Sequence, residues 1–208
     1  MIRSYFGSFI KAILAGLCIG LGGIAYLSCT SKLAGAIFFS IGLLTILIFK
    51  LKLFTGACGL FIEIDKKLSY GFELILIWLG NFLGTFITAL AVTSTRLNFD
   101  LAFVDIKLAD SFSSLLILGI GCGFLMYVGV SAFNLTKLGP IIPIMCVSVF
   151  ILSGFEHCIA DMFYFSLAGL STDILLRLLV ITAGNLLGSW IIPIANQLLK
   201  IGDSVNAK

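Results

Sequence analysis

Apolar runs long enough to cross a lipid bilayer follow one another along almost the whole chain. A helix needs about 20 apolar residues to span the hydrocarbon core, and residues 9–29, 74–95, 115–135 and 175–199 each fit one span. The chain has 208 residues, of which 60% are hydrophobic and 11% are charged, whereas a soluble domain carries about 25% charged residues. The sequence therefore predicts an all-α membrane protein and excludes a soluble enzyme, a disordered chain and a disulfide scaffold.

Two further apolar segments do not fit one span. Residues 34–64 and 138–170 have lengths of 31 and 33 residues, and a helix of either length would extend for about 46–50 Å. This is too long for one span and too short for two spans with a turn. Polar residues stand near the middle of both segments. We interpret each as a helix broken near mid-membrane, over residues 52–56 and 153–157, because unwound backbone is tolerated there when protein or a water-lined cavity surrounds it.

The six predicted spans repeat the order straight, broken, straight. Residues 80–84 and 184–188 both have the pattern Gly-Asn-x-Leu-Gly, centred on Asn81 and Asn185. Three spans in each repeat place the second copy in inverted orientation, and interrupted segments at matching positions of two halves point to a transport site. The alternative is that the two strings arise by chance and mark tight helix packing. We expect one domain over residues 1–208, with inverted repeats at about 7–96 and 112–200.

The distribution of basic residues predicts the orientation in the membrane. One side receives Arg3, Lys11, Lys66, Lys67, Lys137, Lys200 and Lys208, and the other receives Lys32, Arg96, Lys107 and Arg177. This bias predicts a multi-pass protein of the cell (inner) membrane with both termini in the cytoplasm. The basic residues form no cluster or stripe, so we expect no nucleic-acid partner.

The segment around the second break contains the ionisable residues Glu156, His157 and Asp161. Ionisable residues inside a membrane are costly and are candidates for function. His157 is the single histidine of the chain, and an imidazole offers both a donor and an acceptor. The first break holds Thr55 and Gly56, and an inverted repeat would bring both breaks to one point. The alternative for His157 is a buried histidine satisfied by neighbouring helices.

Two motifs at these breaks resemble those of the formate/nitrite transporter family. Residues 154–163 read Gly-Phe-Glu-His-Cys-Ile-Ala-Asp-Met-Phe, close to the family string GFEHSxANMF, and residues 53–56 match its LFTG loop. The Gly-Asn-x-Leu-Gly string at 184–188 extends the resemblance through nearly the whole chain. The resemblance implies an aquaporin-like fold of six spans, assembled as homopentamers in the lipid bilayer. It also implies a channel for small monovalent anions or their protonated acids, such as formate, nitrite, hydrosulfide, acetate or lactate.

The resemblance also implies roles for individual residues. His157 would be the central pore histidine, Thr55 would face it, and Leu53 and Phe54 would extend the same loop. The apolar constrictions would be formed by Phe39, Leu43 and Phe150, and Lys137 would draw anions into a vestibule. The structural support would come from Glu156, Asn81, Asn185 and Asp161. We expect Glu156 to bond loop backbone, and Asp161 either to bond the imidazole or to lie at a subunit interface.

Four positions depart from the family pattern. Asp161, Gly123 and Ala57 stand where the family usually has asparagine, and Lys52 stands where an acid is common. These departures bear on the substrate, because partners of the histidine are among the residues that differ. The charged run Asp100, Asp105, Lys107 and Asp110 is interpreted as a solvated loop.

The expected mechanism follows from the cost of moving charge into apolar surroundings. A bare anion in an apolar constriction pays a large desolvation penalty, whereas a neutral acid does not. The pKa of the anion itself rises as it enters a low dielectric, so we expect it to take up a proton before it passes. The sequence has no enzyme constellation, metal-ligand spacing or phosphate loop, and we expect no cofactor. The alternatives are a channel for water or small neutral solutes and a membrane scaffold without transport.

Overall fold

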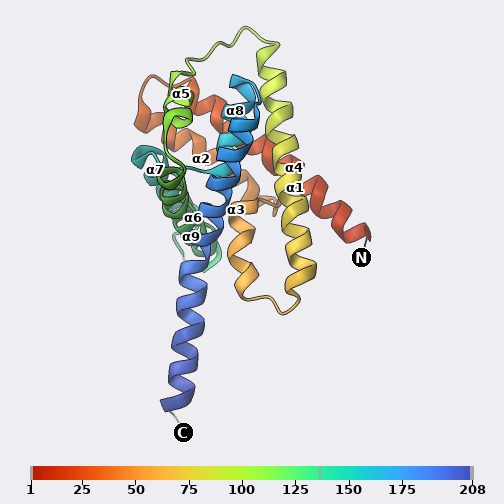
Figure 1. The fold of residues 1–208 in the computed structure, drawn as a ribbon, viewed down its shortest axis with the longest axis vertical. Helices are drawn as coiled ribbons and strands as arrows, with labels where there is room; N and C mark the ends of the chain where they lie inside the picture. The colour runs from red at the N-terminus through yellow and green to blue at the C-terminus, as the bar shows by residue number, and fades with distance from the viewer. Residues whose placement is uncertain (1, 136, 207–208) are drawn as a thin grey trace.

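The computed structural model describes residues 2–135 and 137–206, and all regular secondary structure in this part of the chain is helical (Figure 1). Within it, four helices are long and apolar enough to cross a membrane. They are α1 (Ile2–Leu27), α4 (Lys67–Thr93), α6 (Phe112–Leu135) and α9 (Thr172–Asn206). These helices cover the four segments predicted as straight spans except for residues 28–29 and 94–95, which confirms the prediction of four straight apolar helices. Helix α9 extends beyond the rest of the bundle toward the C-terminus.

Shorter elements occupy the two segments that were too long for one span. Helices α7 and α8 are inclined at 51° to each other, and counting the pair as one span brings the total to five in the described residues. The elements are α2 (Lys32–Ile48), α3 (Phe54–Ala57), the 3₁₀ helix η1 (Cys58–Ile62), α7 (Ile141–Ser153) and α8 (Cys158–Ala168). A further short helix, α5 (Ala102–Ala109), connects α4 to α6.

The helices before the two gaps end in the same way. Gly154 follows α7 with φ of 72°, a left-handed conformation that glycine adopts without steric cost. Lys50 follows α2 with φ of 50°, which is uncommon for a residue with a side chain. In each case the next residue donates its backbone N–H to a carbonyl of the last helical turn. The N–H of Phe155 donates to the carbonyl oxygen of Phe150 at 2.9 Å, and the N–H of Leu51 donates to that of Ile46 at 2.9 Å. Both helices are thus closed by a left-handed cap.

Close helix crossings fix the rest of the bundle. Helix α1 packs on α4, and α6 packs on α9. Gly84 and Gly188 end the two Gly-Asn-x-Leu-Gly strings, and a Cβ added at either one would meet backbone, at the carbonyl oxygens of Ile13 and Ile120 respectively. Small residues let membrane helices approach this closely. The string therefore marks an equivalent crossing in each half of the chain.

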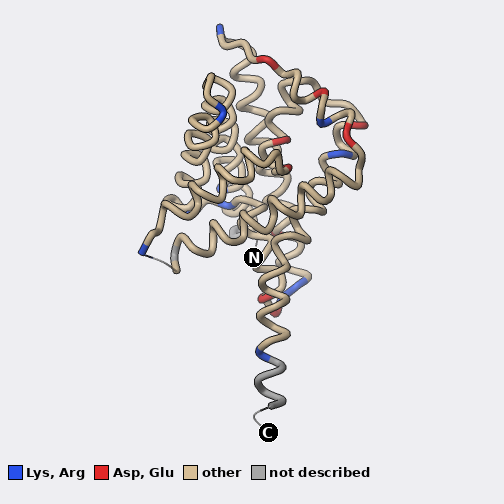
Figure 2. The backbone as a smooth tube through the Cα atoms, turned by 90° about the vertical axis from the view of Figure 1, so that its left-hand side faces the viewer, with Lys and Arg blue, Asp and Glu red and all other residues tan. Residues whose placement is uncertain are grey.

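Charged residues and exposed apolar residues are distributed as a membrane requires. Figure 2 shows that most Lys, Arg, Asp and Glu in the described part lie toward the ends of the bundle, with uncharged backbone between them. Large apolar side chains are exposed on the outside of the long helices, including Leu21, Ile75, Leu90, Ile117 and Leu179. Lipid can cover such a surface, whereas water would not stabilise it.

Candidate pore site

Asn81 of α4 holds the unwound segment before α3. Its Nδ2 donates hydrogen bonds to the carbonyl oxygens of Ala12 at 2.8 Å and Lys52 at 2.9 Å. Its Oδ1 accepts a bond from the backbone N–H of Phe54 at 2.9 Å. The side chain is fully buried. It therefore supplies partners to the Lys52 carbonyl and the Phe54 N–H at the break and ties them to the carbonyl of Ala12 inside α1.

Asn185 of α9 does the same for the segment before α8. Its Nδ2 donates to the carbonyl oxygens of Gly119 at 2.8 Å and Glu156 at 2.7 Å, and its Oδ1 accepts from the N–H of Cys158 at 2.9 Å. Each asparagine bonds backbone groups 29 and 27 residues before it in the sequence. The two halves of the chain thus use the same side chain, at the same spacing, to hold the same kind of break.

His157 and Thr55 meet between the two breaks. The imidazole Nε2 lies 2.9 Å from Thr55 Oγ1, and both side chains are buried. His157 also caps α8, where its Nδ1 accepts the backbone N–H of Ala160 at 3.1 Å. A neutral imidazole has one donor and one acceptor. Because Nδ1 accepts, Nε2 carries the hydrogen and donates it to Thr55, whose own hydroxyl proton stays available for a ligand.

Aromatic rings flank the histidine. The ring of Phe150 stacks on the imidazole with centroids 5.4 Å apart and planes inclined by 14°. Phe39 of α2 meets Phe150 edge-on, with centroids 6.1 Å apart. Leu43 lies one helical turn after Phe39 and is buried as well. The polar pair is therefore bordered by apolar side chains.

Two cavities approach this pair. The first, which we call the lysine cavity, has a volume of about 390 Å³ and is lined by residues that include Lys11, Lys50, Lys52, Leu43 and Leu53. The second, which we call the carboxylate cavity, has a volume of about 300 Å³, and its lining includes Phe39, Phe150, His157, Lys107, Glu156 and Asp161. Phe39 and Leu43 are one turn apart in α2, so the two cavities approach the pair from different levels of that helix.

Two predicted site residues, Phe54 and Lys137, are not among the residues that line these two cavities. Phe54 lines a third cavity of about 450 Å³ with almost wholly apolar walls, between α4 and α9, whereas Leu53 lines the lysine cavity. Lys137 is exposed in the turn after α6 and is absent from the described lining of the lysine and carboxylate cavities. Val130, which belongs to α6, does line the lysine cavity. Lys137 therefore lies beyond that cavity, at the same end of α6.

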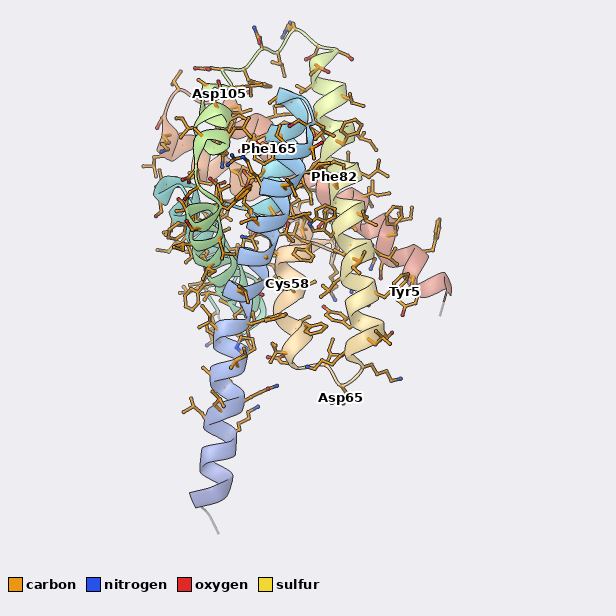
Figure 3. All side chains as sticks on the ribbon, in the orientation of Figure 1. Tyr5, Cys58, Asp65, Phe82, Asp105 and Phe165 are labelled. Carbon is orange, nitrogen blue, oxygen red and sulfur yellow. The ribbon has the colours of Figure 1, made fainter. Side chains whose placement is uncertain are left out.

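Lys107 was not identified from the sequence, and the prediction of a solvated loop around it is wrong. Lys107 lies on α5 with its side chain 17% exposed. Its ammonium donates to a carboxylate oxygen of Glu156 and lies 3.0 Å from Asp161 Oδ1. Four apolar residues of the same run (Phe103, Val104, Ile106 and Leu108) are a signal for a packed helix. Figure 3 shows Asp105, also on α5, at the end of the bundle opposite to Asp65.

The carboxylate of Glu156 differs from its predicted position, and the structure excludes one of the two predictions for Asp161. Glu156 was expected to bond loop backbone, but its carboxylate accepts from Lys107. Asp161 does not contact the imidazole, because Ala160 and Thr55 occupy the two ring nitrogens. Burial lowers the pKa of Lys107, but Asp161 and Glu156 outweigh burial and raise that pKa above its usual value. The ammonium therefore stays charged at neutral pH.

Two of the residues that depart from the family pattern, Gly123 and Ala57, lie in tightly packed or cavity-lining positions. Gly123 of α6 lies so close to α9 that an added Cβ would meet the backbone carbonyl of Asn185. Ala57 is buried and lines the lysine cavity.

The six cysteines all lie in the described part of the chain and are free. Within residues 2–135 and 137–206, no three His, Cys, Asp or Glu side chains lie together in a group that could hold a metal ion.

Replacing Asn185 tests whether its side chain holds the second break. In Asn185→Leu, the carbonyl of Glu156 and the N–H of Cys158 lose their side-chain partner, and each buried unsatisfied group costs about 1–3 kcal/mol. We expect a lower midpoint of thermal unfolding in detergent. Asn196→Leu changes an exposed asparagine of the same helix and is the matched control, expected to unfold like the parent. Equal midpoints for Asn185→Leu and the parent would contradict this role.

Comparisons with known proteins agree with this arrangement. The model of the formate/nitrite transporter family matches residues 2–198. The formate channel FocA of Haemophilus influenzae is 28% identical over 185 residues, which are 76% of this chain and 65% of that protein. The chain thus spans slightly less than two thirds of this relative.

Two solved structures share the fold. One is described as an FNT family ion channel, with a TM-score of 0.80 and 24% identity, covering 90% of this chain and 87% of that one. The other is a pentameric formate channel with formate bound, with a TM-score of 0.80 and 23% identity, covering 96% and 98%. The family match includes both breaks and both asparagines, and the chain belongs to the formate/nitrite transporter family, whose members are channels and not enzymes.

Proposed function

We propose that this chain is a membrane channel for small monovalent anions of the formate class, or for their protonated acids. The observation that carries the proposal is the contact of 2.9 Å between His157 Nε2 and Thr55 Oγ1. It joins two segments whose helices have ended, inside apolar surroundings and between two cavities. The substrate class includes formate, nitrite, hydrosulfide, acetate and lactate.

The proposed topology has six spans in one domain over residues 1–208. Helix α2 with α3 and η1 forms one broken span, and α7 with α8 forms the other. Inverted three-helix repeats then cover about 7–96 and 112–200. The equal spacing of 27 and 29 residues at Asn81 and Asn185 supports this repeat. Both termini would lie on the cytoplasmic side of the cell (inner) membrane.

The proposed assembly is a homopentamer in the bilayer with one pore in each subunit. A solved relative described as a pentameric formate channel with formate bound supports both this assembly and a formate-like substrate. The exposed apolar side chains of the long helices are available to face lipid and neighbouring subunits.

In the proposed pathway the substrate enters as an anion, crosses the constriction as the protonated acid, and leaves as an anion again. Lys11, Lys50 and Lys52 raise the anion concentration in the lysine cavity. A bare anion cannot cheaply enter the apolar constriction beyond it, so the anion takes up a proton from hydronium in the cavity, which leaves as water, and passes as the neutral acid. The hydroxyl of Thr55, which accepts the Nε2–H of His157 and keeps its own proton, is the donor that the acid meets midway.

Thr55→Val tests this pathway, because valine keeps the shape of threonine but removes its hydroxyl. Loss of one hydrogen bond in the constriction should lower formate flux into proteoliposomes on the order of tenfold, and Thr55→Ser should retain most of it. Thr93→Val, at an exposed threonine of α4, is the control and should transport like the parent. Parent liposomes that pass glycerol but not formate would reject the anion channel in favour of a neutral-solute channel, and unchanged flux in Thr55→Val would remove Thr55 from the pathway.

The lysines allow a second test of the proposed pathway. Lys52 lines the lysine cavity and lies 3.5 Å from Glu73, whereas Lys137 lies beyond it. Screening at 0.1 M salt limits the reach of a charge to about 10 Å. We expect Lys52→Gln to lower the uptake of dilute formate severalfold at low salt, and Lys137→Gln to lower it less. Added inert salt should narrow both differences.

An equal or larger loss in Lys137→Gln would place the main anion-attracting charge outside the lysine cavity, as the sequence resemblance implies. Lys66→Gln, at an exposed lysine before α4, measures the effect of a general change in net charge.

A further inference from the structure

The buried cluster of Lys107, Glu156 and Asp161 in the carboxylate cavity holds one more acid than base, and the exposed Lys32 also lines that cavity. Glu156 Oε2 contacts Lys107 Nζ, and Asp161 Oδ1 lies 3.0 Å from the same nitrogen. The side chains of Lys107, Glu156 and Asp161 are 17%, 6% and 1% exposed. If both carboxyls were ionised, this buried cluster would carry a net charge of −1 beside the constriction.

One oxygen of the cluster has no hydrogen-bond partner. Asp161 Oδ2 is buried, and the described residues provide no donor for it. An ionised carboxylate oxygen in such a place is unfavourable, and a carboxyl group escapes the cost by taking a proton. A second carboxylate on the same ammonium adds to this tendency, because neighbouring like charges favour protonation of one member of the pair.

We propose that Glu156 and Asp161 share one exchangeable proton, and that this proton sets the charge of the carboxylate cavity. With the proton bound, the cluster is neutral and the cavity accepts an anion. Without it, the cluster carries −1 and repels the anion. The proposal rests on the proposed channel function and adds to it a proton-binding site that makes one mouth of the pathway sensitive to pH.

The other ionisable groups around the cluster do not set its charge. Those that face it from the surrounding elements are Tyr26, Lys32, Cys122, His157, Cys158 and Tyr164. Thiols and phenols are uncharged near neutral pH, since their ordinary pKa values are about 8.5 and 10. His157 accepts a backbone N–H with Nδ1, so this nitrogen carries no proton. Lys32 is exposed and contacts neither carboxylate through a described ion pair.

Arg177 of α9 is the remaining charged group near α5. Its guanidinium donates to the backbone carbonyls of Lys107 and Asp110 and to the carboxylate of Asp173. Its charge is therefore matched by Asp173, outside the cluster. The pH-dependent charge in the cavity comes from Lys107, Glu156 and Asp161 alone among the described residues.

The ratio of formate flux in Asp161→Asn to that in the parent, measured in proteoliposomes over a range of pH, tests the proposal. Protonation of formate itself affects both proteins equally and cancels in the ratio. In the variant the cluster stays neutral at every pH. We expect a ratio near one in acid that rises roughly tenfold in alkali, where the parent cluster becomes negative and a charge within about 10 Å of the anion opposes its entry.

Asp105→Asn provides the matched control, because Asp105 is an exposed acid on α5 (Figure 3). Its ratio to the parent should not change with pH. A ratio for Asp161→Asn that is flat across the pH range would overturn the proposal.

Infrared difference spectroscopy gives a readout that does not depend on transport. At neutral pH the reconstituted parent should contain the carbonyl band of a protonated carboxylic acid, which disappears as the pH rises and is missing in Asp161→Asn. Absence of this band in the parent would reject the shared proton. A parent that has the band but passes no formate at any pH would reject the channel function and leave the proton site in place.

Discussion

Unwound backbone inside an apolar bundle must find hydrogen-bond partners, and the rest of this structure depends on how that requirement is met. Asn81 and Asn185 meet it with three hydrogen bonds each, two donated to carbonyls and one accepted from the first N–H of a short helix. An asparagine amide suits the task because it offers donors and an acceptor in one fixed plane. Glycines beside each asparagine bring the partner helix close enough for these bonds to form.

The position of the pore residues follows from these two clamps. Once Lys52 and Glu156 are held by their carbonyl oxygens, the chain next presents Thr55 from one segment and His157 from the other, 2.9 Å apart. The capping bond from Ala160 then fixes which ring nitrogen faces Thr55. The two approaches to this point differ in charge, since three lysines line one cavity, whereas the other is lined by Lys32 and by a lysine that two carboxylates share.

The elements of the fold could be predicted from the sequence more fully than the partners of individual side chains. Span length predicted the four straight helices, and α7 ends at Ser153, where the second predicted break begins, whereas α2 ends at Ile48, four residues before the first predicted break. Neighbouring side chains in an irregular segment can point in different directions, which no periodicity encodes, so Phe54 and Leu53 could not be separated in advance. Lys107 was missed because its partners Glu156 and Asp161 are 49 and 54 residues away in the sequence. A charged residue in a short run was therefore read as solvated.

Measuring which ring nitrogens of His157 carry a hydrogen is the most direct test of the claim that the two breaks meet at a neutral imidazole. The chain has a single histidine, so ¹⁵N-histidine labelling in lipid reports on His157 alone. The geometry predicts a neutral ring at neutral pH with its hydrogen on Nε2 and none on Nδ1, and it predicts that Thr55→Val shifts the Nε2 resonance. A ring protonated on Nδ1, or on both nitrogens, would contradict the capping bond from Ala160 and the donor assigned to the pore.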